Sequence, residues 1–68
     1  MTAMTIKLNG QQSETHAHTV AELLQELQAP LTGVAVALNG QVVRKTEQGT
    51  TALHEGDDVE VIRAVQGG

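Results

Sequence analysis

The stretch "TVAELLQEL", residues 19–27, is the segment that decides the fold. Its first residue, Thr19, is followed three positions later by Glu22, a spacing that is typical of a capping box at a helix N-terminus. We expect the Thr19 hydroxyl to accept from the backbone N–H of Glu22, and the Glu22 carboxylate to accept from the backbone N–H of Thr19. The spacing therefore predicts that a helix begins at Thr19.

One side of this predicted helix is apolar and the other is polar. Residues three and four positions apart lie on the same side of a helix, so an apolar stripe marks the side that packs on a core. Pro30 ends the helix, because the residue before a proline is pushed out of the helical region. The apolar stripe consists of Val20, Leu23, Leu24 and Leu27. The side that faces solvent consists of Glu22, Gln25 and Glu26.

A β-hairpin is expected before the helix. Met4, Ile6 and Leu8 alternate with polar residues, which is the period of a half-buried strand. The dipeptide Asn9-Gly10 then favours a two-residue hairpin turn. The return strand, roughly residues 11–17, is mostly polar, as an edge strand can be. Residues 1–3 precede this hairpin and are expected to be an optional extension.

A second hairpin is expected in "GVAVALNGQVV", residues 33–43, where a β-rich run meets the turn dipeptide Asn39-Gly40. Residues 44–52 are polar and contain glycine, which predicts a loop. After Leu53, a turn through Gly56 leads into a last strand over residues 59–65. Val59, Val61 and Val65 share the core face of that strand, and Arg63 interrupts them.

The order of elements is two strands, a helix, two strands, a loop and a strand. A helix that follows a hairpin buries its stripe by crossing the sheet, and this crossover makes the first and last strands parallel central neighbours. The sequence therefore predicts an α+β fold of the β-grasp (ubiquitin-like) type, with one helix packed across a mixed sheet of four to five strands. Residues 1–65 form this domain, and residues 66–68 form a flexible tail.

The composition excludes several classes of function. The chain has no cysteine, so it offers no thiol nucleophile, and no Phe, Tyr or Trp on which single-stranded nucleic acid could stack. Eight acidic against four basic residues, a net charge of −4, disfavour contact with phosphate backbones. No segment has the pattern of a secretory signal or the length of a membrane span. We therefore expect a cytoplasmic protein that binds neither nucleic acid nor membrane.

Three histidines are candidate metal ligands. His16 and His18 are alternate strand residues that point to one face, but His54 is distant in sequence and structural zinc sites use four ligands. We expect solvent-facing histidines and no metal site. The chain also lacks a Gly-rich nucleotide-binding loop of its own.

The chain ends in Gly67-Gly68. Because glycine has no Cβ atom, an extended Gly-Gly end can thread a slot that excludes other residues. A carboxylate is ionised at neutral pH and is a poor acyl electrophile, so another protein that binds a nucleotide would have to activate it. The pattern predicts a reactive C-terminal carboxyl, and the competing interpretation is an inert, frayed end.

The segments "MTIKLNG" (residues 4–10), "TVAELLQEL" (19–27), "VAVALNGQVV" (34–43) and "LHEGDDVEVIRAVQGG" (53–68) resemble the thiamine-pathway sulfur carrier proteins known as ThiS. The resemblance implies that an E1-like adenylating enzyme (ThiF-like) uses ATP and Mg²⁺ to adenylate Gly68. Sulfur from a donor such as a cysteine desulfurase then gives a thiocarboxylate, from which a thiazole synthase (ThiG-like) takes sulfur. On this basis Gly67 supplies flexibility, and the protein is a co-substrate that is neither an enzyme nor a cofactor carrier.

Three other functions remain open at this point. The small subunit of molybdopterin synthase shares the fold and tail, but is usually longer and often has a proline before Gly-Gly, where this chain has Ala64, Val65 and Gln66. A ubiquitin-like modifier would pass the same acyl-adenylate to lysine amines. A β-grasp interaction module would have an inert terminus.

A carrier that meets enzymes needs a docking surface. Apolar residues on the outer face of the last strand suit the centre of such a surface, and acidic residues before and on that strand suit steering by a basic rim on the activating enzyme, or are a solvated turn. The candidate docking residues are Ile62, Ala64 and Val43 for the apolar centre, and Asp57, Asp58 and Glu60 with Glu55 for the acidic part.

Overall fold

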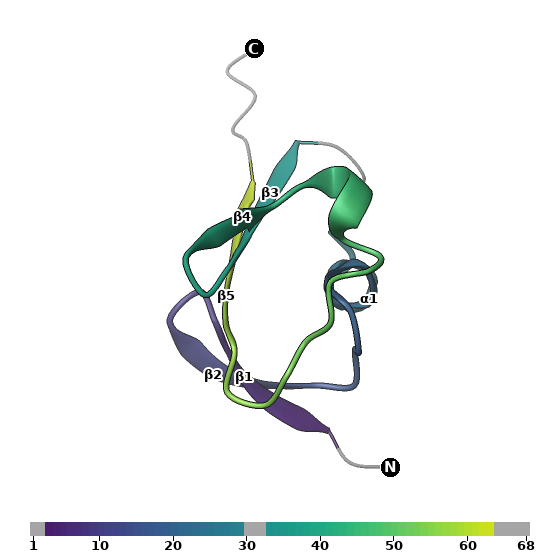
Figure 1. Ribbon diagram of the computed structural model, residues 1–68. Coiled ribbons are helices and arrows are strands. Elements are labelled where there is room, and N and C mark those ends of the chain that lie inside the picture. Colours follow the sequence, from purple (N-terminus) through teal and green to yellow (C-terminus); the bar gives the residue numbers. More distant parts are fainter. Residues whose placement is uncertain (1–2, 30–32, 64–68) are drawn as a thin grey trace.

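The structure of the protein is a computed structural model (Figure 1), and it describes residues 3–29 and 33–63. Figure 1 shows α1 lying along one face of the sheet, and the other face of the sheet is open. The elements of the described part are β1 (Met4–Leu8), β2 (Gln11–Thr15), α1 (Val20–Glu26), β3 (Val34–Leu38), β4 (Gln41–Val43), the 3-10 helix η1 (Lys45–Glu47) and β5 (Asp58–Arg63).

The strands form one mixed sheet in the order β2-β1-β5-β3-β4. β1 and β5 are parallel neighbours, and the other three pairings are antiparallel. The predicted β-grasp arrangement is confirmed, with β2 on an edge and the first and last strands side by side. The predicted boundary at residue 65 between domain and tail lies outside the described residues.

Both hairpin turns have the backbone that their sequences predict. Asn9 and Gly10 have φ values of 50° and 84°, and Asn39 and Gly40 have 52° and 86°. Two successive positive φ angles define the turn type whose twist matches a two-stranded ribbon. The turns set the pairing across each hairpin, because a two-residue loop leaves its flanking residues opposite each other.

The core lies between α1 and the sheet. Val20 and Leu23 of α1 are completely buried, whereas Leu24 and Leu27 are partly buried at the border of the core. The predicted stripe is therefore confirmed, but only half of it reaches the centre. The buried apolar residues of the described part are Ile6, Ala17, Val20, Leu23, Val36, Val43, Leu53 and Val59.

The start of α1 confirms half of the predicted capping box and corrects the other half. The Thr19 hydroxyl accepts from the N–H of Glu22 at 3.2 Å. The Glu22 carboxylate accepts from the N–H of His18 at 2.7 Å, and not from that of Thr19 as predicted. Thr19 has an extended backbone and pairs with Ala52 in an isolated bridge, and this pairing places the preceding N–H within reach of the carboxylate.

The segment at residues 44–52 is more ordered than the predicted loop. The segment contains η1, and two of its backbone carbonyls cap the N-terminus of α1. The carbonyl of Thr51 accepts from the N–H of Val20 at 3.0 Å, and that of Gln48 accepts from the N–H of Ala21 at 2.9 Å. The first N–H groups of any helix have no partner within the helix. This segment supplies partners from far along the chain, which the polar composition did not indicate.

The end of α1 is made by a local backbone motif. Gln28 has a φ of 56°, its N–H donates to the carbonyl of Gln25, and the N–H of Ala29 donates to the carbonyl of Leu24. These two bonds and the left-handed residue define a Schellman motif. The helix has thus ended at Glu26, before Pro30, which lies outside the described residues.

β2 is two residues shorter than predicted because Thr15 turns the chain inward. Its buried hydroxyl accepts from the N–H of Ala17 and donates to the carboxylate of Glu26 at the end of α1. The same carboxylate accepts from the N–H of His16 at 3.0 Å. One side chain therefore ties the helix end to the connection that precedes it.

These bonds make the contribution of Glu26 to stability depend on pH. The hydrogen bond from Thr15 lowers the pKa of Glu26 below its ordinary value of 4.5, partial burial opposes this, and the backbone N–H and charge of His16 lower it further. A depressed pKa in the folded state means that the contribution is complete above pH 4.5 and is lost as the pH falls through the lowered value. The effect is small because solvent screens this exposed group.

We expect the Glu26→Gln variant to have a lower free energy of unfolding than the parent at pH 7. This difference in free energy should narrow at about pH 3, which is on the order of one unit below the ordinary pKa of a glutamate. Urea unfolding followed by circular dichroism at both pH values measures this difference. A difference of the same size at both would show that ionisation of Glu26 plays no part.

Candidate functional site

The candidate functional site is the end of β5, the strand that leads to the C-terminus. The predicted reactive residue Gly68, its neighbour Gly67 and the docking candidate Ala64 lie outside the described residues. β5 is a central strand, antiparallel to β3 over five residue pairs and parallel to β1 over two. Its last residue, Arg63, is opposite Val34, the first residue of β3.

The asparagines of the two hairpin turns hold β5 from both sides. Asn9 Oδ1 accepts from the N–H of Val61 at 2.8 Å, beyond the point where β1 ends. Asn39 Oδ1 accepts from the N–H of Asp58 at 2.9 Å, and Asn39 Nδ2 donates to the carboxylate of Asp57 at 3.1 Å. The turn residues therefore also fix the strand that carries the C-terminus.

We expect the Asn9→Gly variant to lose about 1 kcal/mol of stability, the usual net worth of one hydrogen bond. Glycine keeps the positive φ of the turn but leaves the N–H of Val61 without its partner. The Asn9→Asp variant retains the acceptor oxygen and should remain close to the parent. Chemical denaturation of the three proteins measures the difference, and equal losses in both variants would show that the turn, not the bond, matters.

The open face of the sheet, away from α1, is apolar around the end of β5. Ile62 has 57% of its surface exposed, and Val42 on β4 has 75%. Between them lie two small residues of β3, because Ala35 is opposite Ile62 and Ala37 is opposite Val42. These four residues, named here the open-face patch, form a flat apolar surface: Ala35, Ala37, Val42 and Ile62.

Val43 does not belong to this surface, contrary to the prediction. It is 8% exposed, faces the core, and is opposite the buried Val36. Its neighbour Val42 takes the predicted position instead. The signal was present in the sequence, because the two-residue turn at Asn39-Gly40 places Leu38 opposite Gln41, and strict alternation then puts Val42 outside and Val43 inside.

The acidic candidates lie before β5 (Asp57) or in its first half (Asp58 and Glu60). Asp58 opens the strand, so Arg63 is about 17 Å away along it at the usual rise per residue. Asp58 and Glu60 are exposed and share the open face with Ile62, since alternate strand residues point the same way. Glu60 is opposite Ala37 of the open-face patch, and Asp58 lies two residues further from the end of the strand.

Asp57 has a structural role in the turn before β5. Its carboxylate accepts from the N–H of His54 at 2.7 Å and from Asn39 Nδ2 at 3.1 Å, and its side chain is only 13% exposed. Both oxygens are thus engaged inside the protein. Of the predicted acidic docking residues, Asp58 and Glu60 present free carboxylate surface and Asp57 does not.

The three histidines do not form a cluster with other potential metal ligands in the described part of the chain. His16, His18 and His54 are exposed, and within residues 3–29 and 33–63 no group of three or more potential ligands comes together. No helix of the described part is long and apolar enough to cross a membrane.

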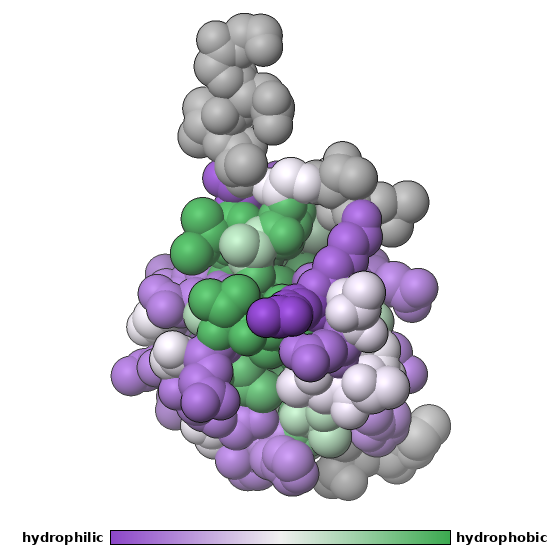
Figure 2. Space-filling model, turned by 45° about the horizontal axis from the view of Figure 1, so that its top comes forward, coloured by the Kyte–Doolittle hydropathy of each residue, from purple (hydrophilic) through white to green (hydrophobic). Residues whose placement is uncertain are grey.

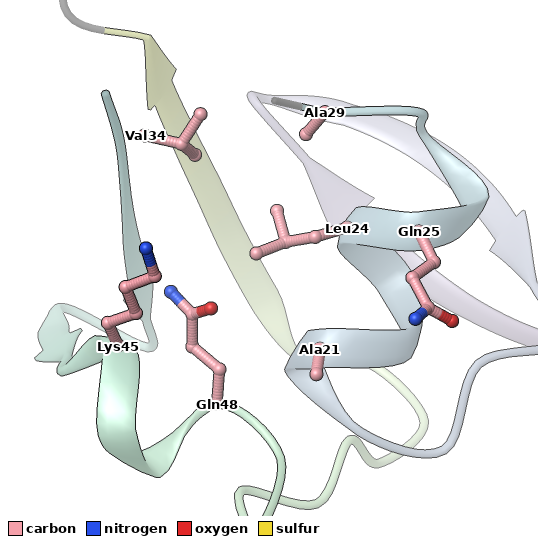
Figure 3. A pocket seen from close by; sticks show the side chains of 7 residues that line it. All are labelled: Ala21, Leu24, Gln25, Ala29, Val34, Lys45 and Gln48. Atoms are coloured by element: carbon pink, nitrogen blue, oxygen red, sulfur yellow. The ribbon is translucent and has the colours of Figure 1, made fainter. Parts of the chain in front are cut away.

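On the helix side of the sheet, a pocket of about 150 Å³ opens between α1, η1 and the start of β3 (Figure 3). Leu24 and Val34 point toward it from opposite walls, and Lys45 and Gln48 extend to its rim from η1. Figure 2 shows apolar side chains gathered over the strands near the end of β5, and mostly hydrophilic side chains on the side of α1 and η1. The remaining lining residues are Ala21, Gln25 and Ala29.

Comparison with known proteins gives a consistent result. The chain matches the ThiS family over residues 6–68. It is 39% identical over 61 residues to the sulfur carrier protein ThiS of Thermus thermophilus, covering 90% of this chain and 95% of that one.

Two solved structures are also similar. The crystal structure of the thiamine biosynthesis protein ThiS from Geobacter metallireducens has a TM-score of 0.81 and 32% identity, covering 96% of this chain and 100% of that one. A solution structure of a thiamine biosynthesis protein from the same organism has a TM-score of 0.79 and 33% identity, covering 96% and 88%.

Proposed function

Since the chain belongs to the ThiS family, we propose that it is a sulfur carrier of thiamine biosynthesis whose C-terminal carboxyl bears the sulfur. It is a protein co-substrate and not an enzyme. The observation that carries the proposal is that the family match extends through the last strand to Gly68. The absence of cysteine agrees with it, because the carrier holds sulfur on a carbonyl carbon.

The chemistry follows from the low reactivity of a carboxylate. A carboxylate at neutral pH is ionised and resists nucleophiles, so an E1-like adenylating enzyme couples Gly68 to the α-phosphate of ATP, and pyrophosphate leaves. Hydrosulfide, or a donor persulfide whose sulfur–sulfur bond is then reduced by a thiol, displaces AMP from the carbonyl carbon and gives a thiocarboxylate. A thiazole synthase accepts this sulfur. ATP and Mg²⁺ belong to the adenylating enzyme, and the carrier supplies only its terminus and a surface to hold.

The open-face patch is the proposed contact surface for the adenylating enzyme. It is apolar at its centre and continues along β5 toward the C-terminus, and the exposed carboxylates of Asp58 and Glu60 border it. An apolar centre with a charged rim is the usual anatomy of an interface between proteins. The acidic rim favours an enzyme surface with basic residues facing it.

Intact mass spectrometry tests the proposed function. Incubation with ATP, Mg²⁺, the adenylating enzyme of the same organism and a sulfur donor is expected to raise the mass of the carrier by about 16 Da, the difference between oxygen and sulfur in the family chemistry. Omission of ATP is the control and should leave the mass unchanged. A complete reaction that forms no such species contradicts the proposal.

A parallel incubation separates the thiamine pathway from its rivals. The adenylating enzyme of molybdopterin synthesis should act on this chain less efficiently than that of thiamine synthesis. In cells, a protein modifier would yield a ladder of high-mass conjugates on a blot. A tagged sulfur carrier should yield none. A preference for the molybdopterin enzyme, or an abundant ladder, would reassign the function within the same fold.

A further inference from the structure

The end of the sheet where β5 stops carries most of the positive charge of the chain. Arg63 ends β5, and Arg44 and Lys45 directly follow β4. They are three of the four Lys and Arg residues in a chain whose net charge is −4. All three side chains are exposed. Within the part of the chain that the structure describes, none of the three forms an ion pair, with Glu47 of η1 or with any other carboxylate.

Two of these cations adjoin the helix-side pocket. Lys45 lines its rim (Figure 3). Arg63 pairs with Val34, which also lines the pocket, and residues paired across antiparallel strands share a face of the sheet. The side chain of Arg63 therefore lies on the helix side, together with the pocket, and not on the open face.

The pocket can take one apolar side chain. Leu24, Val34, Ala21 and Ala29 give it apolar walls, and its volume is about 150 Å³. An apolar cavity of this volume in another protein is large enough to bind benzene. A single aliphatic or aromatic side chain is thus of suitable size, and a charged group next to it would meet the rim.

We propose that this pocket is a second docking site, and that it receives an apolar side chain flanked by carboxylates on a partner protein. The cations at the rim attract an acidic segment and repel a basic one, so they select the partner by charge. This inference rests on the proposed function, because the open-face patch is assigned to the adenylating enzyme and the partner of the pocket is then the thiazole synthase that accepts the sulfur. The open-face patch by itself gives no reason to expect a second docking site.

The two docking surfaces have opposite charge because strand residues alternate between faces. Asp58 and Glu60 accompany Ile62 on the open face, whereas Arg63 points to the helix side with Lys45. A basic enzyme surface suits the first and an acidic segment suits the second. The adenylating enzyme and the sulfur acceptor act in succession on one terminus, and two surfaces let each enzyme recognise the carrier by different residues.

Binding measurements on the full chain test the pocket. The probes are the purified adenylating enzyme and the purified thiazole synthase of the same organism, titrated by calorimetry at low and high salt. We expect the Lys45→Glu/Arg63→Glu variant to leave binding of the adenylating enzyme unchanged and to bind the thiazole synthase at least tenfold more weakly, with a flatter dependence on salt. The Lys7→Glu variant is the charge control, since Lys7 is opposite Asp58 at the other end of β5, and should bind that enzyme as the parent does.

The Ala21→Leu variant tests the pocket without changing charge. It places a larger side chain into the space between α1 and η1 and should weaken the same enzyme, and not the other, at least tenfold. Thermal unfolding checks that the variant remains folded. Unchanged binding of the thiazole synthase by the charge variant, or by a folded Ala21→Leu variant, overturns the inference.

The outcomes separate this inference from the proposed function. If the parent chain gains about 16 Da but the pocket variants bind both enzymes normally, the sulfur-carrier function stands and the second docking site falls. If the parent chain gains no sulfur in the complete reaction, the function falls, and the pocket loses its partner with it.

Discussion

A single glycine added after Gly68 should abolish formation of the thiocarboxylate, with a loss of at least 100-fold in rate. The extra residue moves the carboxyl by about 3.5 Å along an extended chain, and a misplacement of about 1 Å at a reacting centre can cost about 100-fold. The adenylating enzyme should still bind the extended carrier, because the folded domain is unchanged. The rate of ATP–pyrophosphate exchange and the mass of the carrier both report this result.

The matched control adds the same glycine before Met1. It changes length and composition equally but leaves the C-terminal carboxyl in place, so activation should proceed at the parental rate. If the C-terminally extended chain is adenylated at more than about a tenth of the parental rate, the geometric argument is wrong. Equal loss in both variants would instead point to a defect in folding.

The second large effect is expected from the Leu23→Ala variant, which should lose about 2–5 kcal/mol of stability. Leu23 is 1% exposed at the centre of the core, so its removal leaves a cavity as well as losing transfer free energy. A small domain has only about 5 kcal/mol of stability or somewhat more. The variant should therefore lose a large part of its stability and unfold at a much lower urea concentration than the parent.

The neighbouring Leu24→Ala variant is the matched control. Leu24 is partly buried and lines the helix-side pocket, so truncation should cost about 1–2 kcal/mol, less than burial of a complete side chain provides. Urea unfolding at a permissive temperature gives both values. A larger loss for Leu24 than for Leu23 would mean that the helix is rotated relative to the sheet from its position in this structure.

The difference between these two leucines shows how far sequence patterns reach. The spacing of the stripe predicted that both face the core, and both do. Their unequal burial depends on the direction in which the helix crosses the sheet and on the segment at residues 44–52, which covers the start of α1 but leaves a pocket beside Leu24. Contacts between segments distant in sequence set this, and no local pattern contains them.

The candidate site shows the same division. The exposure of Ile62 followed from alternation along one strand and was predicted correctly. The choice of Val43 over Val42 was wrong because register was not carried through the turn at Asn39-Gly40. The acidic residues were expected before and on the last strand, and Asp58 and Glu60 lie on it. The basic end was not predicted, because only the packed sheet brings Lys45 to the pocket and places Arg63 opposite Val34, one of its lining residues.

By itself the sequence determined the elements whose causes are local: the two hairpin turns, the capped helix, the alternating strands, and the Gly-Gly end on which the proposed chemistry depends. Short-range rules of backbone angle and periodicity suffice for these. Only the tertiary structure decided that Asn9 and Asn39 hold β5, that Glu22 bonds to His18, and that positive charge gathers at the helix-side pocket. The asparagine bonds join residues up to 52 positions apart, which meet only when the whole chain has packed. The bond between His18 and Glu22 is local, but it forms beside the pairing of Thr19 with the distant Ala52.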